Sequence, residues 1–126
     1  MSNITVLVDI DAPQLNSVRG LALNRTTLGQ GGTLTVTNEV AIRCTGGGPY
    51  TVNLPLITSE NAGMTLTISA EQGSFDGPNA ITIQVASGSN NKILNLQSRT
   101  ISVLHGFIIL INNGVDKWLV ESSNVS

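Results

Sequence analysis

Short stretches in which apolar and polar residues alternate recur along this 126-residue chain and constrain its fold more than any other feature. In residues 64–70 (Met-Thr-Leu-Thr-Ile-Ser-Ala) every even position is apolar and every odd position carries Thr or Ser. Because successive side chains of a strand point to opposite faces, this pattern predicts a strand with one buried face. Ile, Val and Thr, which favour strands, together supply 36 residues. We therefore expect a nearly all-β chain of eight to ten strands.

The alternating stretches are separated by segments rich in Gly, Pro, Asn and Asp, which favour turns. Residues 46–49 (Gly-Gly-Gly-Pro) form one such turn, and residues 112–114 (Asn-Asn-Gly) predict a hairpin before the last strand. The chain has the length of one domain. We predict an antiparallel β-sandwich, jelly-roll-like, over residues 29–126. The expected strands are residues 34–36, 40–44, 50–54, 64–70, 81–85, 93–96, 100–103, 107–111 and 117–121.

Residues 1–28 lack the regular alternation of the rest of the chain. Residues 4–10 have the pattern of a strand that ends before Pro13, but the leucines and valines that follow show no period of two. The glycine-rich residues 29–32 resemble a boundary, so we predict an N-terminal arm over residues 1–28. Two alternatives stay open: a short helical turn from Pro13 to Gly20, and two further strands of the same sheet.

Residues 107–111 (Phe-Ile-Ile-Leu-Ile) are apolar at every position, so both faces of this predicted strand need a cover. The arm or a second subunit supplies it, or else the strand lies centrally within its own chain. Charged residues make up only 11% of the chain, so few lysines are available to protect sheet edges. We therefore predict an obligate homo-oligomer in which Phe107, Ile108 and Leu110 are buried between subunits.

Candidate chemical groups are few, and we predict no catalytic, cofactor-binding or metal-binding residues. Cys44 and His105 are the only residues of their kinds, and no Gly-x-Ser-x-Gly nucleophile motif occurs. Asp9 and Asp11 resemble half of a calcium loop, so a structural cation shared between subunits stays open. Trp118 is expected in the core, with stacking on a sugar as the alternative. A formal net charge of -2 argues against nucleic-acid binding, and the longest apolar run is too short for a membrane span.

From Tyr50 to the C-terminus the chain resembles a β-module of tailed-bacteriophage structural proteins, notably head-decoration (capsid cement), head-fibre and tail-fibre proteins. The resemblance depends on the order of its elements: a Val-x-Leu-Pro strand, a Gly-x-x-x-Thr-Ile strand, an Ile-Thr-Ile strand and a closing Asn-Gly hairpin followed by Trp. Related sequences often place an aromatic and a glycine-rich stretch before that hairpin, where this chain has residues 94–105. The segments that match are residues 51–55, 61–68, 79–83, 109–114 and 117–120.

This resemblance implies a virion structural role, trimeric assembly and no catalysis. The expected function is that of a decoration protein, assembled in the host cytoplasm, which binds the capsid exterior as a homotrimer and stabilises the head. Its expected partners are copies of itself and the major capsid protein, with no nucleic acid and no membrane. The residues expected to contact the capsid are Ile4, Val6, Val8, Asp9, Asp11, Arg19 and Arg25.

Two other functions are kept as alternatives. A receptor- or glycan-binding knob of a phage tail or head fibre is the first of them. A glycan hydrolase that uses a pair of carboxylates is the other.

Overall fold

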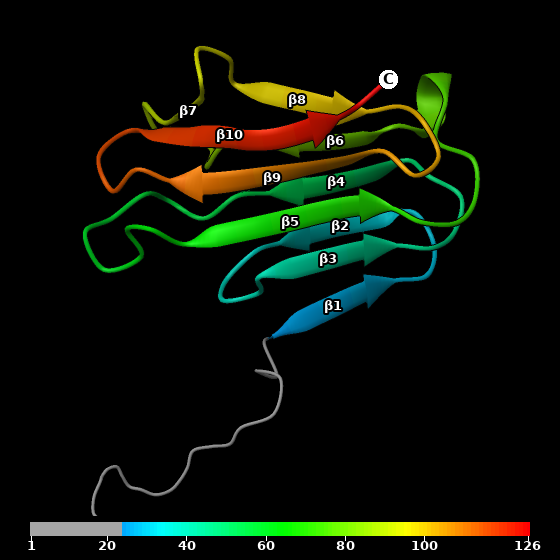
Figure 1. The fold of residues 1–126 in the computed structure, drawn as a ribbon, viewed down its shortest axis with the longest axis horizontal. Coiled ribbons are helices and arrows are strands. Elements are labelled where there is room, and N and C mark those ends of the chain that lie inside the picture. The colour runs from blue at the N-terminus through cyan, green and yellow to red at the C-terminus, as the bar shows by residue number, and fades with distance from the viewer. Residues whose placement is uncertain (1–23) are drawn as a thin grey trace, which may run out of the picture.

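The chain alternates between two facing sheets in the computed structural model, which describes residues 24–126 (Figure 1). A single 3-10 turn, η1 (Gly77–Asn79), is the only helical element in that part of the chain. The strands are β1 (Arg25–Leu28), β2 (Gly32–Thr35), β3 (Ala41–Cys44), β4 (Tyr50–Asn53), β5 (Thr65–Ala70), β6 (Ile81–Gln84), β7 (Lys92–Ile93), β8 (Ser98–Ile101), β9 (Phe107–Asn112) and β10 (Lys117–Asn124).

The first six strands wind as three successive coils. Strands β1, β3 and β5 pair in parallel in one sheet, while β2, β4 and β6 pair in parallel in the other. One coil is a strand of the first sheet followed by a strand of the second, so the coils are β1–β2, β3–β4 and β5–β6. Each coil stacks on the next through backbone hydrogen bonds, which is the arrangement of a short parallel β-solenoid.

The remaining strands close one end of this stack. β8 pairs antiparallel with β6, β9 pairs antiparallel with β5 and β10, and β7 pairs in parallel with β10. The six-stranded sheet therefore has the order β1-β3-β5-β9-β10-β7, and the four-stranded sheet has the order β2-β4-β6-β8. In Figure 1, β7 and β8 lie at one end of the molecule and β1 lies at the other.

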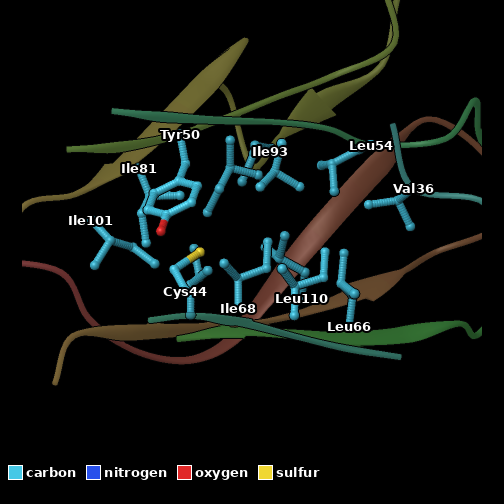
Figure 2. Close-up of a cluster of buried hydrophobic side chains, with 14 of the residues drawn as sticks. Val36, Cys44, Tyr50, Leu54, Leu66, Ile68, Ile81, Ile93, Ile101 and Leu110 are labelled. Atoms are coloured by element: carbon cyan, nitrogen blue, oxygen red, sulfur yellow. The ribbon is translucent and has the colours of Figure 1, made fainter. Parts of the chain in front are cut away.

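The core lies between the sheets and is mostly aliphatic. Figure 2 shows Tyr50, Leu54 and Ile81 on one side facing Cys44 and Ile68 on the other. All of these side chains are at most 1% exposed. Burying a side chain of this size stabilises the fold by about 1.5–3 kcal/mol. The alternation predicted for residues 64–70 is confirmed, since Leu66, Ile68 and Ala70 are buried and the Thr and Ser side chains between them point outward.

Glycine turns stack on one another at one corner of the solenoid. The N–H of Gly31 donates to the carbonyl oxygen of Gly47 at 2.9 Å, and the N–H of Gly48 donates to that of Ser74 at 3.3 Å. A Cβ atom on Gly46 would overlap the carbonyl oxygen of Gly29. The backbones of neighbouring segments therefore approach Gly46 and Gly48 too closely for a side chain, whereas nothing lies within 4 Å of the Cβ position of Gly47.

Two buried asparagines hold the long connection between β4 and β5. Asn91 accepts a hydrogen bond from the N–H of Ile57 at 3.0 Å through its Oδ1. Asn112 donates from Nδ2 to Oδ1 of Asn61 at 2.6 Å and accepts from the N–H of Gly114 through its own Oδ1. The Oδ1 of Asn91 and both ends of the Asn112 amide thus have partners in neighbouring loops, which reduces the cost of placing these side chains in the interior.

The predicted all-β class is confirmed, but the predicted antiparallel, jelly-roll-like pairing is wrong for the three coils, whose strands β1 to β6 pair with one another in parallel. Alternation identifies a strand and its buried face without identifying its neighbour. The turn at residues 46–49 carries the chain from β3 in one sheet to β4 in the other, instead of folding it back as a hairpin. Such crossings between facing sheets allow parallel pairing without intervening helices.

Within the glycine-rich residues 29–32, residues 29–31 connect β1 to β2 and Gly32 begins β2, so this stretch does not separate an arm from the domain. Residues Arg25–Leu28 of the predicted arm form β1 and pair with β3, so they belong to the six-stranded sheet. The rest of the predicted arm, up to residue 23, lies outside the described residues.

Candidate assembly surface

The outward face of the six-stranded sheet carries an apolar stripe at its middle. On β9, Ile108 and Leu110 point into the core, so Phe107, Ile109 and Ile111 point outward. These three side chains are partly exposed. Leu119 of β10 pairs with Ile111 and is 42% exposed. We call Phe107, Ile109, Ile111 and Leu119 the outer apolar stripe.

Hydroxyl side chains border the stripe on the side of β5. In the antiparallel ladder, Thr65 pairs with Ile111, Thr67 with Ile109 and Ser69 with Phe107. These β5 side chains point outward, because the core residues of that strand alternate with them. Apolar and hydroxyl groups thus share this part of the face, and no charge needs to be desolvated when another surface covers it.

Charged groups lie on both sides of the stripe. Arg43 of β3 donates from Nε to Oε1 of Glu71 at 2.9 Å, and the Ser69 hydroxyl donates to Oε2 of the same carboxylate at 2.8 Å. These hydrogen bonds, that of Ser69 first, lower the pKa of Glu71. On the opposite side, Lys92 and Lys117 pair in register at the β7 edge. The stripe is therefore an uncharged zone with ionic groups on both sides.

The end of the solenoid formed by β1 and β2 is open among the described residues. β3 is the only strand that neighbours β1 there, and β4 is the only strand that neighbours β2. Each of these two strands consequently has one edge whose N–H and C=O groups form no strand ladder. We call this surface the open end.

The structure separates the residues predicted for a subunit interface. Ile108 and Leu110 are 0% exposed and pack in the chain's own core, whereas Phe107 points to the opposite face. We therefore correct the assignment of Ile108 and Leu110, which a second subunit cannot reach in this fold. β9 lies between β5 and β10, as in the alternative of a central strand within its own chain.

Of the residues predicted to contact a capsid, only Arg25 lies within the described part of the chain. It is exposed on β1, and it pairs in register with Ala41 on the outward face. The other residues of that prediction lie outside the described residues: Ile4, Val6, Val8, Asp9, Asp11 and Arg19.

The single histidine and the single cysteine of the chain are held by the fold, His105 in a turn and Cys44 in the core. His105 lies in the turn before β9 with a φ of 69°, and its backbone N–H donates to the carbonyl oxygen of Ala70 at 2.6 Å. Cys44 is fully buried, and burial raises the pKa of its thiol to about 12.

Within residues 24–126, no three His, Cys, Asp or Glu side chains lie together as a metal site. None of the described residues forms a helix with the length and hydropathy needed to cross a membrane.

No protein-family model matches the chain, and a search of curated proteins also finds no match.

Sequence reasoning missed the outward members of the stripe, Ile109, Ile111 and Leu119, and it missed the parallel coils. A signal for each is present in the sequence. The five apolar residues of β9 belong to two faces, so burying one face leaves the other as the exposed surface. For the coils, the glycine-rich residues 29–32 are followed by a second glycine-rich turn at residues 46–48, about one coil further along the chain.

Proposed function

We propose that this chain is a structural protein of a bacteriophage virion, which decorates the capsid exterior as a homotrimer and stabilises the head. The outer apolar stripe is the observation that carries the assembly part of this proposal. Large apolar side chains in an uncharged zone at the middle of a sheet face mark a site of protein–protein contact. The resemblance of residues 50–126 to β-modules of phage head and fibre proteins supports the virion part.

The size of the sheet face limits what the stripe contributes. Six strands about 4.8 Å apart, with about five residues each at about 3.3 Å per residue, make a face of about 30 by 17 Å. A stable interface buries about 800 Å² on each partner. The stripe is therefore the apolar centre of a subunit contact that also includes neighbouring strands or loops, with a polar rim as in other interfaces.

Capsid attachment is assigned to the N-terminal region and to charges on the adjoining strand. In this proposal Arg25, exposed on β1, contributes together with Ile4, Val6, Val8, Asp9, Asp11 and Arg19. Three copies of a modest contact in one trimer bind a symmetric capsid position far more tightly than one copy does. This multivalent attachment is the proposed mechanical basis of head stabilisation.

A glycan-binding knob is the weaker candidate, because nearly all aromatic side chains are inside the fold. Trp118, Tyr50 and Phe75 are at most 2% exposed, and Tyr50 and Phe75 stack on each other with ring centroids 6.1 Å apart. Phe107 is the remaining aromatic residue of the chain and is only partly exposed. Stacking on a sugar ring requires an open aromatic face.

Binding to purified heads tests the proposal. Heads prepared without this protein are mixed with the full chain and sedimented, and host envelope preparations are treated in parallel. We expect saturable binding to heads at a stoichiometry that is a multiple of three, and none to envelopes. Binding to envelopes instead of heads would favour the knob, and binding to neither would contradict decoration.

A further inference from the structure

The turn between β9 and β10 contains the residue pair of this chain that is most prone to spontaneous deamidation (Figure 1). Asn113 is followed by Gly114, and no other asparagine of the chain precedes a glycine. Asparagine is among the residues that limit the chemical durability of proteins. It reacts most readily before glycine, because glycine has no side chain to hinder attack by its own backbone nitrogen.

Deamidation of this pair proceeds in two steps. The backbone nitrogen of Gly114 attacks Cγ of Asn113, and the new C–N bond closes a succinimide ring. The Cγ–Nδ2 bond breaks, and the side-chain nitrogen leaves as ammonia with the proton that the Gly114 nitrogen gives up. Water then opens the ring at either carbonyl group, which leaves aspartate or isoaspartate at position 113.

Burial does not prevent this reaction. The side chain of Asn113 is exposed at the turn, and Gly114 is only partly buried. Water therefore reaches the site at which the ring would form. Any protection in the folded chain must come from hydrogen bonds that hold the two reacting groups.

The attacking nitrogen is held by the preceding asparagine. The N–H of Gly114 donates to Oδ1 of Asn112 at 2.6 Å. Asn112 is only 1% exposed, so water cannot easily replace it in this hydrogen bond. Because the nitrogen must lose this same proton to form the ring, the N–H has to leave Oδ1 before the reaction can begin.

The side-chain amide under attack is also held. Its Oδ1 accepts hydrogen bonds at 2.9–3.0 Å from three successive backbone N–H groups, those of Val115, Asp116 and Lys117. Its Nδ2 donates to Oδ1 of Asp116 at 3.2 Å. Turning the Asn113 amide toward the Gly114 nitrogen would strain or break these bonds.

Asn112 itself is fixed from outside the turn. Its Nδ2 donates to Oδ1 of Asn61 at 2.6 Å, and that oxygen also accepts from the N–H of Thr58 at 2.9 Å. The backbone of Asn112 pairs with the start of β5, through its N–H to the carbonyl oxygen of Met64 and through its carbonyl oxygen to the N–H of Gly63, both at 2.9 Å. The orientation of the Asn112 amide therefore does not depend on the exposed turn.

We propose that Asn113 is a latent deamidation site and that Asn112 is the positioning residue that protects it in the folded chain. Asn112 does so by holding the N–H of Gly114 away from the Asn113 side chain. The reaction becomes fast only when the turn opens.

Deamidation would prevent the turn from closing again in the same way. The product has no Nδ2 donor for Asp116 and places a second carboxylate beside it. Isoaspartate also lengthens the backbone between the two strands. The pairing of Ile111 with Leu119 lies next to this turn and would be disturbed first.

Peptide mapping by mass spectrometry measures deamidation of Asn113 in the full chain during incubation at pH 8. We expect the folded chain to react at least about tenfold more slowly than the chain in denaturing urea, because the turn must open first. Asn112→Ala should speed the reaction of the folded chain about threefold to tenfold, as expected for the loss of one hydrogen bond. It should leave the rate in urea unchanged.

Gly46→Ala is the matched control, because it destabilises the fold at a distant turn without touching Asn112 or Gly114. It should leave the deamidation rate of the folded chain unchanged. Slow labelling of Cys44 shows that each variant is still folded. Should Asn112→Ala fail to fold, Asn61→Ala takes its place, because it frees the Asn112 amide and should also speed the reaction.

Equal deamidation rates in the folded chain and in urea would overturn the proposal. An unchanged rate in the folded Asn112→Ala variant would also overturn it, and so would an equal rise in Gly46→Ala. In the last case general unfolding, and not the position of Asn112, would control the reaction.

Discussion

Cys44 is fully buried in the core and is the only thiol in the chain. Burial, with a smaller contribution from the charge of Glu71, raises its pKa to about 12. The thiolate is the form that reacts with alkylating and disulfide reagents. Cys44 is protected from them because its thiol stays protonated and because it is buried. This residue therefore serves as a packing group and as an internal reporter of unfolding.

We predict that Cys44 is unreactive toward a disulfide reagent at pH 8 in the native chain and reacts fully in denaturing urea. The measurement is the rate of thiol release at increasing urea concentration. Because there is no second cysteine, the signal belongs to this residue alone. Native labelling at the rate of a free thiol would contradict the burial described for β3.

Glu71 gives a pH dependence with a definite sign. Its pKa is lowered from the ordinary value of 4.5 by hydrogen bonds from Ser69 and Arg43. A lowered folded-state pKa contributes stability that is present above the unfolded value and is lost as the pH falls through the folded value. The pair is partly exposed, so its contribution lies within about 1 kcal/mol.

We therefore expect Glu71→Gln to lower the free energy of unfolding slightly at pH 7, and the difference from the unmodified chain to shrink as the pH falls below 4.5. Urea denaturation at pH 7 and pH 3 measures both values. Glu60→Gln, in an exposed turn, is the control. A deficit of the same size at both pH values would show that the carboxylate charge is not the cause.

At the scale of elements, alternation was enough to predict where most strands lie. Residues 81–85 and 107–111 were placed nearly as β6 and β9 are found. β7 is shorter than predicted, because Leu94 adopts a φ of 57° that ends the strand after Ile93. The neighbour of each strand in its sheet could not be predicted in the same way, because Ile42 would be buried equally well beside a parallel or an antiparallel strand. Parallel pairing depends on contacts between segments distant in sequence, which local patterns do not encode.

The glycine turns stack through backbone contacts, so an alanine substitution should have very different effects on stability at the adjacent residues Gly46 and Gly47. Gly46→Ala should destabilise the fold by about 1–3 kcal/mol, because the new methyl group would overlap the carbonyl oxygen of Gly29 in the coil beside it. Gly47→Ala should change stability by no more than about 0.5 kcal/mol, because nothing lies within 4 Å of its Cβ position. Thermal unfolding of the two variants measures the difference. Equal effects would contradict the stacking of these turns.

At the scale of the whole molecule, the fold explains why residues 107–111 are apolar throughout. One side of β9 completes the core of its own chain, and the other side forms the outer apolar stripe. The sequence predicts a strand that needs cover on both faces, but the prediction of the inward residues Ile108 and Leu110 at the interface is wrong, because an apolar run does not show which face meets the core. The surface proposed for assembly is therefore Ile109, Ile111 and their neighbours.

Native mass measurement of the full chain at micromolar concentration tests the assembly role most directly. We predict a homotrimer of about three times 13.2 kDa. The double variant Ile109→Thr with Ile111→Thr should dissociate, because hydroxyl groups replace the centre of the stripe. Val115→Thr, at a 77% exposed turn residue, should remain trimeric. A stable monomer of 13.2 kDa for the unmodified chain, or a double variant that stays trimeric, would contradict the account.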